Sequence, residues 1–499
     1  MRNTGKRHSA LTKLLGLFAA LALFATACGS DTVSDVADAA GDAAGDAADA
    51  VEEAVDGDEE EAMEDEEEAM EDEEEAMEDE EEAMEDEEEV EEQTIVVALV
   101  GNPQIEDIAT LTPEFFTAET GINVEFTFLP EDELRAVTTR DVSAGGEQFD
   151  VVQIGMFETP QFGESGFLLG LNDFIAETPE YNVDDLLPAV RNGLSVDGEL
   201  FSAPVYGESS FIMYRTDLID NMPEAPTWQE VADIANAVNT DDVAGICLRT
   251  RPGWGDLGAT FGTVLNTFGG TYWLANDDGS IGEAQVDQPE FREALQFYGD
   301  LYNSAGLQNL DGSFNECRTA FDEGQVAIWY DATVAAGLLE EGQQAGNIGY
   351  ALAPTNVTDT SGWLWAWTMA IPVSSSNPDA AWEFISWATS EEYINLAGEN
   401  IGWASAPPGT RTSTYANPNY IEAAESFAQR TLDAMNAAPI DNPGTTPRPG
   451  LPGVQYVGVP EFQNVGNLCT QEFNNFFAGG SIDDAISACQ EIAAAETVG

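Results

Sequence analysis

The chain has 499 residues, of which 43% are hydrophobic and 9% aromatic, which is enough for a large core and for more than one lobe. Its formal net charge of −79 disfavours nucleic acid as a partner, because phosphate binding needs clustered Lys and Arg. So acidic a composition is also typical of proteins from salt-rich surroundings, where ions screen the self-repulsion.

Residues 1–28 predict a lipoprotein signal peptide. Basic residues precede an apolar run at 14–25 that is short for a membrane span, and the ATAC sequence that ends at Cys28 resembles the bacterial lipoprotein cleavage box. That box usually has Leu where Ala25 stands, so ordinary signal cleavage stays an alternative. We expect lipidation of Cys28 and export to the outer face of the cytoplasmic membrane or the periplasm.

Removal of this signal would also remove the only histidine, His8, and both lysines, Lys6 and Lys13. Catalysis by Ser-His-Asp or Cys-His groups, histidine metal sites, lysine Schiff bases and Walker-type phosphate loops would then be excluded. We therefore expect no catalytic residue, no metal and no cofactor.

Residues 29–93 contain no Trp, Tyr or Phe, and the heptapeptide AMEDEEE occurs four times at 62–89. Ala and Met are adjacent in each repeat, so no apolar seam for a coiled coil forms. Like-charge repulsion predicts a disordered acidic stalk. Binding of cations or of a partner is the alternative interpretation.

Beyond Gln93, short apolar runs such as TIVVALV and FDVVQI alternate with helix-like segments such as DIATLTPEFFTAETG and PTWQEVADIANAVN. This alternation predicts an α/β fold with mainly parallel sheets, and about 400 residues of it predict two lobes. The sequence NDDGSIGE at 276–283 is typical of a hairpin turn, and its spacing does not fit a calcium loop.

Four cysteines remain if Cys28 is lipidated, an even number that favours disulfides in an exported protein. Three pairings are possible. We favour Cys247 with Cys317 and Cys469 with Cys489, because these partners are the nearer ones in sequence.

The sequence SGWLWAWTMAIP at 361–372 places Trp363, Trp365 and Trp367 at alternate positions. In an extended strand these indoles project to one face and form a continuous aromatic surface about three rings long. That surface is either part of the core or a platform for a ligand.

Several segments together resemble the family 1 extracellular solute-binding proteins, the receptors of sugar-importing ABC transporters. These are TIVVALVGNP with LTPEFFTAETGINVEF, APVYGESSFIMYRTDLID, and GQVAIWYDATVAAG with the Trp segment. Within that family, GICLRTRPGWGD, WYDATVAAG, GWLWAW, PPGTRTS and VGVPEFQNVG are most similar to receptors for mannitol, sorbitol and related sugar alcohols.

The resemblance implies a two-lobed periplasmic-binding-protein fold of type II, with crossing strands between the lobes and ligand in the cleft. The N-terminal lobe would comprise 94–205 and 370–412, and the C-terminal lobe 206–369 and 413–499. It also implies a monomer that captures a small neutral polyol or sugar by closure and delivers it to ABC permease subunits.

Cleft-lining positions carried over from the resemblance give ten candidate ligand contacts. They are Asn102, Phe157, Glu208, Arg249, Trp254, Asp331, Trp363, Trp365, Trp367 and Glu461. Carboxylate, guanidinium and amide groups would bond the hydroxyls, and indole faces would cover the C–H groups. The alternatives are an oligosaccharide receptor of the same fold, a carbohydrate-active enzyme using paired carboxylates, and a structural or adhesive surface protein.

Overall fold

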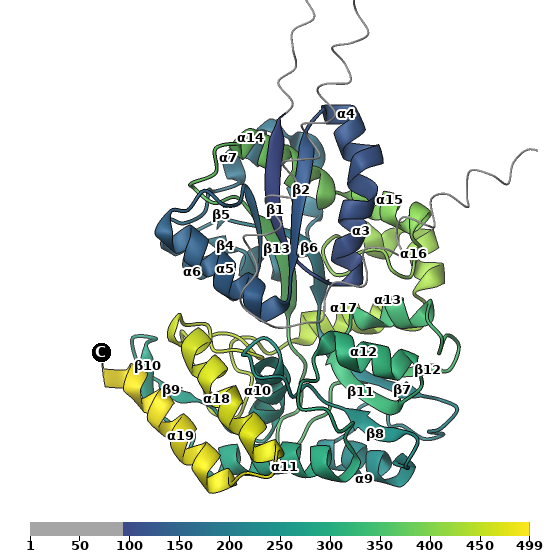
Figure 1. The fold of residues 1–499 in the computed structure, drawn as a ribbon, viewed down its shortest axis with the longest axis vertical. Coiled ribbons are helices and arrows are strands. Elements are labelled where there is room, and N and C mark those ends of the chain that lie inside the picture. Colours follow the sequence, from purple (N-terminus) through teal and green to yellow (C-terminus); the bar gives the residue numbers. More distant parts are fainter. Residues whose placement is uncertain (1–92, 499) are drawn as a thin grey trace, which may run out of the picture. The chain divides into compact units, whose positions relative to one another are not determined.

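The computed structural model describes residues 93–498, and their elements group around two main sheets (Figure 1). The first sheet has the strand order β2-β1-β3-β13-β6. Its strands are β1 Thr94–Val100, β2 Asn123–Leu129, β3 Val151–Gly155, β6 Ala203–Glu208 and β13 Trp365–Ala370. The chain segments between β1, β2 and β3 contain α3 Pro103–Thr112, a π-helical segment Pro113–Thr117, α4 Ala118–Thr120 and α5 Glu131–Ala144.

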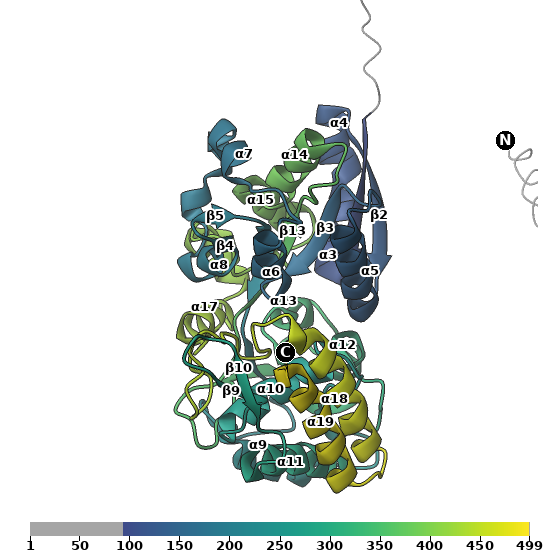
Figure 2. The ribbon, with the colours of Figure 1, turned by 90° about the vertical axis from the view of Figure 1, so that its left-hand side faces the viewer.

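The second sheet has the strand order β12-β7-β11-β8. Its strands are β7 Ser210–Arg215, β8 Ala244–Cys247, β11 Val326–Ala332 and β12 Ile348–Leu352. The helices that accompany it are α9 Trp228–Val238, α10 Leu257–Thr267, α11 Pro289–Ala305, α12 Phe314–Asp322 and α13 Ala335–Glu340. Helices α18 Glu461–Phe477 and α19 Ile482–Ala495 lie side by side in both views (Figures 1 and 2).

The remaining α-helices and strands have at most 11 residues each, apart from single turns of 3-10 helix. They are α6 Glu158–Glu164, α7 Asn172–Glu177, α8 Pro188–Gly193, β4 Ser195–Val196, β5 Glu199–Leu200, β9 Trp273–Ala275, β10 Ile281–Ala284, α14 Pro378–Ala388, α15 Glu391–Asn400, α16 Pro418–Ala423 and α17 Ala428–Ala437. Strands β9 and β10 pair antiparallel, which confirms the hairpin predicted at 276–283. Within residues 93–498, every helix is too short or too polar to cross a bilayer.

Local sequence signals explain several element boundaries. Helix α3 begins after Asn102, whose side-chain oxygen accepts from the Ile105 backbone N–H at 3.1 Å, and Pro103 stands at the first helical position. Helix α9 begins with a capping box in which Thr227 and Glu230 each bond the other's backbone N–H.

Both sheets are mixed, so the prediction of mainly parallel sheets was wrong. Strand β1 pairs parallel with β2 and β3, but β13 runs antiparallel to both β3 and β6. In the second sheet β11 is parallel to β8 and antiparallel to β7. The strands that cross between the two sheets cause the antiparallel pairs. Strand β6 leads through Ser209 directly into β7 of the other sheet. Strand β13 brings the chain back and runs opposite to β3, which belongs to the parallel part of the first sheet.

The strands near the crossings extend the first sheet past the predicted lobe boundaries. Strand β6 stays in this sheet to Glu208, and β13 joins it at Trp365. The exact division into lobes remains a prediction. The proposed signal, Cys28 and almost the whole acidic stalk lie outside the described residues.

Two disulfides join Cys247 to Cys317 and Cys469 to Cys489, the pairing favoured from the sequence. The first fixes the end of β8 to α12, and the second fixes α18 to α19. All four cysteines are buried. Both bonds therefore lie in the interior of the second half of the molecule.

Candidate ligand-binding site

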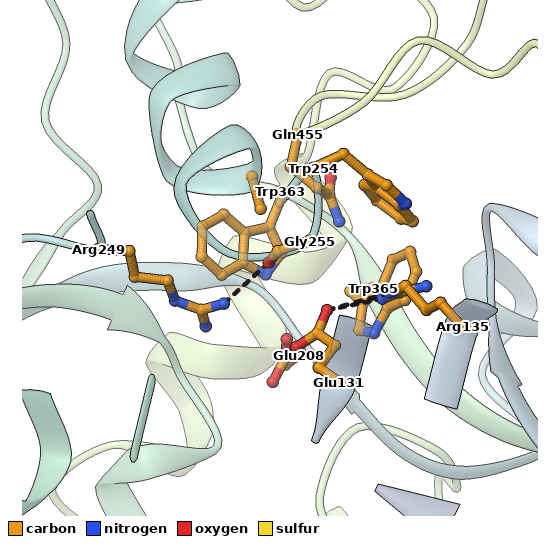
Figure 3. A pocket seen from close by; sticks show the side chains of 10 residues that line it. Glu131, Arg135, Glu208, Arg249, Trp254, Gly255, Trp363, Trp365 and Gln455 are labelled. Carbon is orange, nitrogen blue, oxygen red and sulfur yellow. Dashed lines mark hydrogen bonds and ion pairs between the residues drawn. The ribbon is translucent and has the colours of Figure 1, made fainter. Parts of the chain in front are cut away.

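A cavity of about 290 Å³, its opening to solvent included, lies where the two halves meet, and residues from both halves line it (Figure 3). Charged groups and indoles dominate its wall. The lining residues are Glu131, Arg135, Glu208, Arg249, Trp254, Gly255, Ala259, Trp363, Trp365 and Gln455.

Direct contacts between the halves show that the cleft is closed. The Asn315 side chain donates to the Gly101 carbonyl at 3.2 Å, and the Phe157 ring centre lies 4.6 Å from that of Trp254. Each contact joins an element next to the first sheet to one next to the second. Such contacts are broken when a hinged protein opens, so this arrangement is the closed state of a two-lobed fold.

Arg249 follows β8 and is held rigidly at the wall. Its Nε and Nη2 donate to the two carboxylate oxygens of Asp331 at 2.9 and 2.6 Å, and its Nη1 donates to the Gly255 carbonyl at 2.9 Å. Burial lowers the pKa of this guanidinium, but the charges of Asp331 and Asp256 outweigh burial and raise it above its ordinary value. A guanidinium has five N–H donors, so Arg249 keeps donors for a ligand.

Arg135 on α5 occupies a similar position on the opposite wall. Its guanidinium donates to Glu131 at 2.8 Å and to Glu158, and it lies 4.2 Å from the Trp254 ring centre and 4.7 Å from that of Trp367. Cation–π contact adds to these bonds when the site is desolvated. The arginine thus joins the indoles of the two halves.

Glu208, the last residue of β6, is only 6% exposed and faces the cavity (Figure 3). Burial raises the pKa of its carboxyl well above the ordinary range; the positive charge of Arg249 opposes this, and the negative charges of Asp331 and Glu131 add to it. The Trp363 indole lies close enough to lower the same pKa, yet its buried N–H has no partner at hydrogen-bond distance within residues 93–498. A hydroxyl placed between these groups would satisfy both.

The tryptophan segment forms the predicted continuous aromatic surface only in part, because the rings of Trp365 and Trp367 are in contact with each other but not with that of Trp363. Trp363 precedes β13, and the Trp365 and Trp367 rings meet edge to face at 85° with their centres 5.6 Å apart. Arg135 covers Trp367, which does not line the cavity. Trp365 lies over Gly155, where a Cβ would come within 1.9 Å of the indole. The wall therefore presents separate indole faces at different angles.

The other predicted residues lie around the cavity. Asn102 caps α3 and donates to the Tyr206 hydroxyl at 3.2 Å, and Asp331 holds Arg249 from behind. Phe157 packs on Trp254 across the cleft. Glu461 stands in the first turn of α18 and is half-buried. None of these four lines the cavity, whereas Glu208, Arg249, Trp254, Trp363 and Trp365 do.

Three polar side chains that line the cavity were not predicted from the sequence, namely Glu131, Arg135 and Gln455. Glu131 and Arg135 are four residues apart in EDELR, a spacing that pairs opposite charges on one helix face and could have drawn attention to them. Gln455 lies in an irregular segment rich in Gly and Pro, so no periodic pattern marks it. Its amide donates to the Leu364 carbonyl at 3.3 Å, while its buried Oε1 has no partner within the described range.

Further carboxyls converge where the halves meet. Burial and the charge of Glu131 raise the pKa of Asp132 to about 6, against the opposing effect of Arg135. Burial, Glu131 and Asp132 likewise raise the pKa of Asp256 well above its ordinary value, although Arg249 lowers it. Closure thus places acidic groups of both halves together in a poorly hydrated space.

The fold and this site define a two-lobed binding protein that closes around a small polar molecule. The chain belongs to the family of bacterial extracellular solute-binding proteins, whose family model matches residues 102–394.

Two relatives extend the match over most of the chain. A mannitol-binding protein of Pseudomonas aeruginosa is 36% identical over 416 residues, which cover 81% of this chain and 93% of the relative. An ABC transporter solute-binding protein of Agrobacterium vitis S4, solved with bound D-mannitol, is 41% identical with a TM-score of 0.78 over 81% of this chain and 98% of that one. A ribitol complex from Agrobacterium radiobacter K84, 19% identical with a TM-score of 0.70 over 81% and 98%, shares the fold.

Proposed function

We propose that this protein is the extracellular receptor of an ABC importer and that it binds a small linear sugar alcohol of the mannitol, sorbitol or arabitol type. The observation that carries the proposal is the closed cavity whose wall combines indole faces, two anchored arginines and the buried Glu208. The mannitol ligands of the two relatives above support the choice of ligand class.

The wall fits the chemistry of an alditol. Such a molecule carries a hydroxyl on every carbon, and each hydroxyl both donates and accepts. Glu208 and the Gln455 oxygen would accept, and the Trp363 N–H and the remaining N–H groups of Arg249 would donate. The faces of Trp254 and Trp365 would cover the C–H groups.

The charges of the wall favour a neutral ligand. Arg249 is already neutralised by Asp331, and Arg135 by Glu131 and Glu158. An anionic ligand would find no unpaired positive charge in the wall to offset the cost of its burial, and a cationic one would be repelled by the two arginines that border the cavity. Hydroxyls avoid both costs.

The hydrogen bonds and the buried apolar area are sufficient for tight binding. Hydrogen bonds to charged groups contribute about 1.5–3 kcal/mol each and neutral ones about 0.5–1.5 kcal/mol. Micromolar affinity needs roughly 8 kcal/mol after the costs of association. Three or four bonds to Glu208 and Arg249, together with contact on two indoles, reach that range.

The size of the cavity separates the polyol from the oligosaccharide alternative. The space between its walls is about 290 Å³ even when its opening to solvent is included, so it is short and narrow. One six-carbon chain is the class of ligand that suits such a space. A longer glucan would require the cleft to remain more open than the contacts between Phe157 and Trp254 allow.

We further propose that the protein is a receptor and not an enzyme, in keeping with the binding proteins that form its family. Ligand that bridges both halves stabilises the closed state, and the permease would recognise that state. Catalysis would be detected as turnover of glycosides by the purified protein, and we expect none.

The test is calorimetric titration of the purified protein with mannitol, sorbitol, arabitol, ribitol and maltose, with Trp fluorescence recorded in parallel. We expect one alditol to bind at micromolar or lower Kd with a change in the indole spectrum. Binding of maltose alone would replace the polyol by an oligosaccharide, and no binding by a folded protein would reject the proposed function.

Anchoring at Cys28 is a separate part of the proposal. We propose that lipid on this residue holds the receptor at the membrane surface and that the acidic stalk acts as a spacer. A Cys28→Ser variant should then be released into the soluble fraction with the mass of an unlipidated chain. Membrane retention of that variant would contradict the anchor without affecting ligand binding.

A further inference from the structure

A second, smaller cavity, of about 200 Å³ when its opening to solvent is included, lies in the second half of the molecule next to the first. It is lined by α10, by the segment at 271–272, by the irregular segment at 448–457 and by the start of α18. Gln455 borders both cavities. All of its lining residues except Tyr456 are buried.

The unusual feature of this cavity is Arg448, which is only 3% exposed. Its Nη2 donates to the Gly453 carbonyl at 2.6 Å, and no carboxylate between residues 93 and 498 lies within ion-pair distance of it. The other buried arginines of this part of the chain, Arg135, Arg249 and Arg411, each have at least one acidic partner.

Arg448 nevertheless carries its charge at neutral pH. Burial lowers the pKa of its guanidinium to about 10, and no neighbouring group raises it again. An isolated buried positive charge is costly, and proteins normally offset that cost by pairing it with an anionic group.

The rest of the wall supplies a second donor and apolar contacts. The Tyr272 hydroxyl is buried and has no hydrogen-bond partner within the described residues. The Asn266 amide donates to the Val454 carbonyl at 2.6 Å and is therefore engaged. Leu265, Val457 and Phe462 make much of the remaining surface apolar.

We propose that this cavity is a binding site for one monovalent anion, which pairs with Arg448 and faces the Tyr272 hydroxyl. A single guanidinium balances one negative charge, so sulfate or phosphate would leave charge uncompensated in an apolar wall. Chloride and a small carboxylate such as formate share the required chemistry, being monovalent acceptors small enough for the cavity. This site is independent of the proposed polyol function.

The experiment compares the full chain with Arg448→Met in equilibrium unfolding, over a titration of sodium chloride and of sodium formate, with sodium sulfate at equal ionic strength as the reference. General salt effects act on both proteins alike, so the difference between them isolates the site. Arg292→Met is the matched control, because Arg292 is exposed and paired with Asp483 on the surface.

We expect the folded-to-unfolded ratio of the wild type to rise relative to Arg448→Met in a saturable way, about 100-fold when the anion reaches 100 times its Kd. Arg292→Met should follow the wild type. If this ratio rises only with added chloride, the site binds a halide; if it rises only with added formate, the site binds a carboxylate. Parallel curves for wild type and Arg448→Met in both salts would overturn the proposal, and so would an equal rise in sulfate.

A second measurement uses the wild type alone, in case Arg448→Met does not fold. Crystals soaked in sodium bromide should show an anomalous peak within hydrogen-bond distance of the Arg448 guanidinium. Absence of such a peak, together with unfolding that responds equally to chloride, formate and sulfate, would reject the site.

Discussion

The residues of the ligand cavity fall into those that face it and those that hold them in place. Arg249 faces it, and Asp331, which is fully buried, fixes both the position and the charge of Arg249 from behind. The same division separates Arg135 from Glu158. The charged groups can serve as ligand contacts in this poorly hydrated cavity because each is already paired with a group of opposite charge.

Glu208 is the residue whose loss should affect the ligand most directly. Truncation in Glu208→Ala removes an acceptor that borders the cavity, and a hydrogen bond to such a group contributes about 1.5–3 kcal/mol, so we expect affinity for the alditol to fall roughly 10- to 100-fold. Calorimetry measures this. Glu208→Gln keeps an acceptor of similar shape and should lose less. Unchanged affinity in the Ala variant would remove Glu208 from the site.

Loss of the Asp331 carboxylate should lower the free energy of unfolding more than loss of a carboxylate from an ion pair on the surface. Asp331→Ala leaves the buried Arg249 without its main partner, and breaking a buried pair in this way costs about 3–5 kcal/mol. The exposed pair between Arg251 and Asp311 provides the comparison, because Asp311→Ala should cost about 1 kcal/mol or less. Denaturant unfolding of both variants checks the difference, and equal losses would contradict it.

At the scale of elements, the site depends on where β3 and β13 place their side chains. Gly155 ends β3, and the Trp365 indole from β13 occupies the space that a side chain at 155 would take. The close approach of these strands therefore determines the angle at which this indole meets the cavity.

Gly155→Ala should displace the Trp365 indole, because the new Cβ would lie 1.9 Å from it. Overpacking of this kind costs about 1–3 kcal/mol, so we expect lower stability together with weaker alditol binding. Thermal unfolding and calorimetry measure the two effects. Gly101→Ala is the control, since the nearest atoms there are 3.8 Å away. If both variants resembled the wild type, the indole would not depend on Gly155.

The strands and helices were easier to predict from the sequence than the residues of the cavity. Apolar runs predicted β1 and β3 because every second or every residue in them is buried, and α9 lies within the predicted helix-like segment PTWQEVADIANAVN. Residues at or just after strand ends, such as Glu208 and Arg249, were predicted through the resemblance. Arg135 and Gln455 were missed because they reach the cavity only when the two halves come together, which no local pattern encodes.

At the scale of the whole molecule, closure should be linked to protons. Asp132 on α5 meets the other half at Gly253, where an added Cβ would lie 2.5 Å from the carboxylate. Its pKa, raised to about 6 by burial and by Glu131, would return towards the ordinary value of 3.8 on opening. Arg135, Arg251 and Arg249 oppose this rise without cancelling it.

The closed state therefore binds more protons than the open state between about pH 4 and 6, so acid favours closure and ligand binding takes up protons there. With pKa values of about 6 closed and 3.8 open, affinity should be about tenfold higher at pH 5 than at pH 7.5. Calorimetry at pH 5.5 in two buffers of different ionisation enthalpy counts the protons. Asp132→Asn should reduce both the uptake and the pH dependence, whereas Asp220→Asn, a change at an exposed position, should alter neither. Proton release on binding would show that opening, not closure, raises the pKa of these carboxyls.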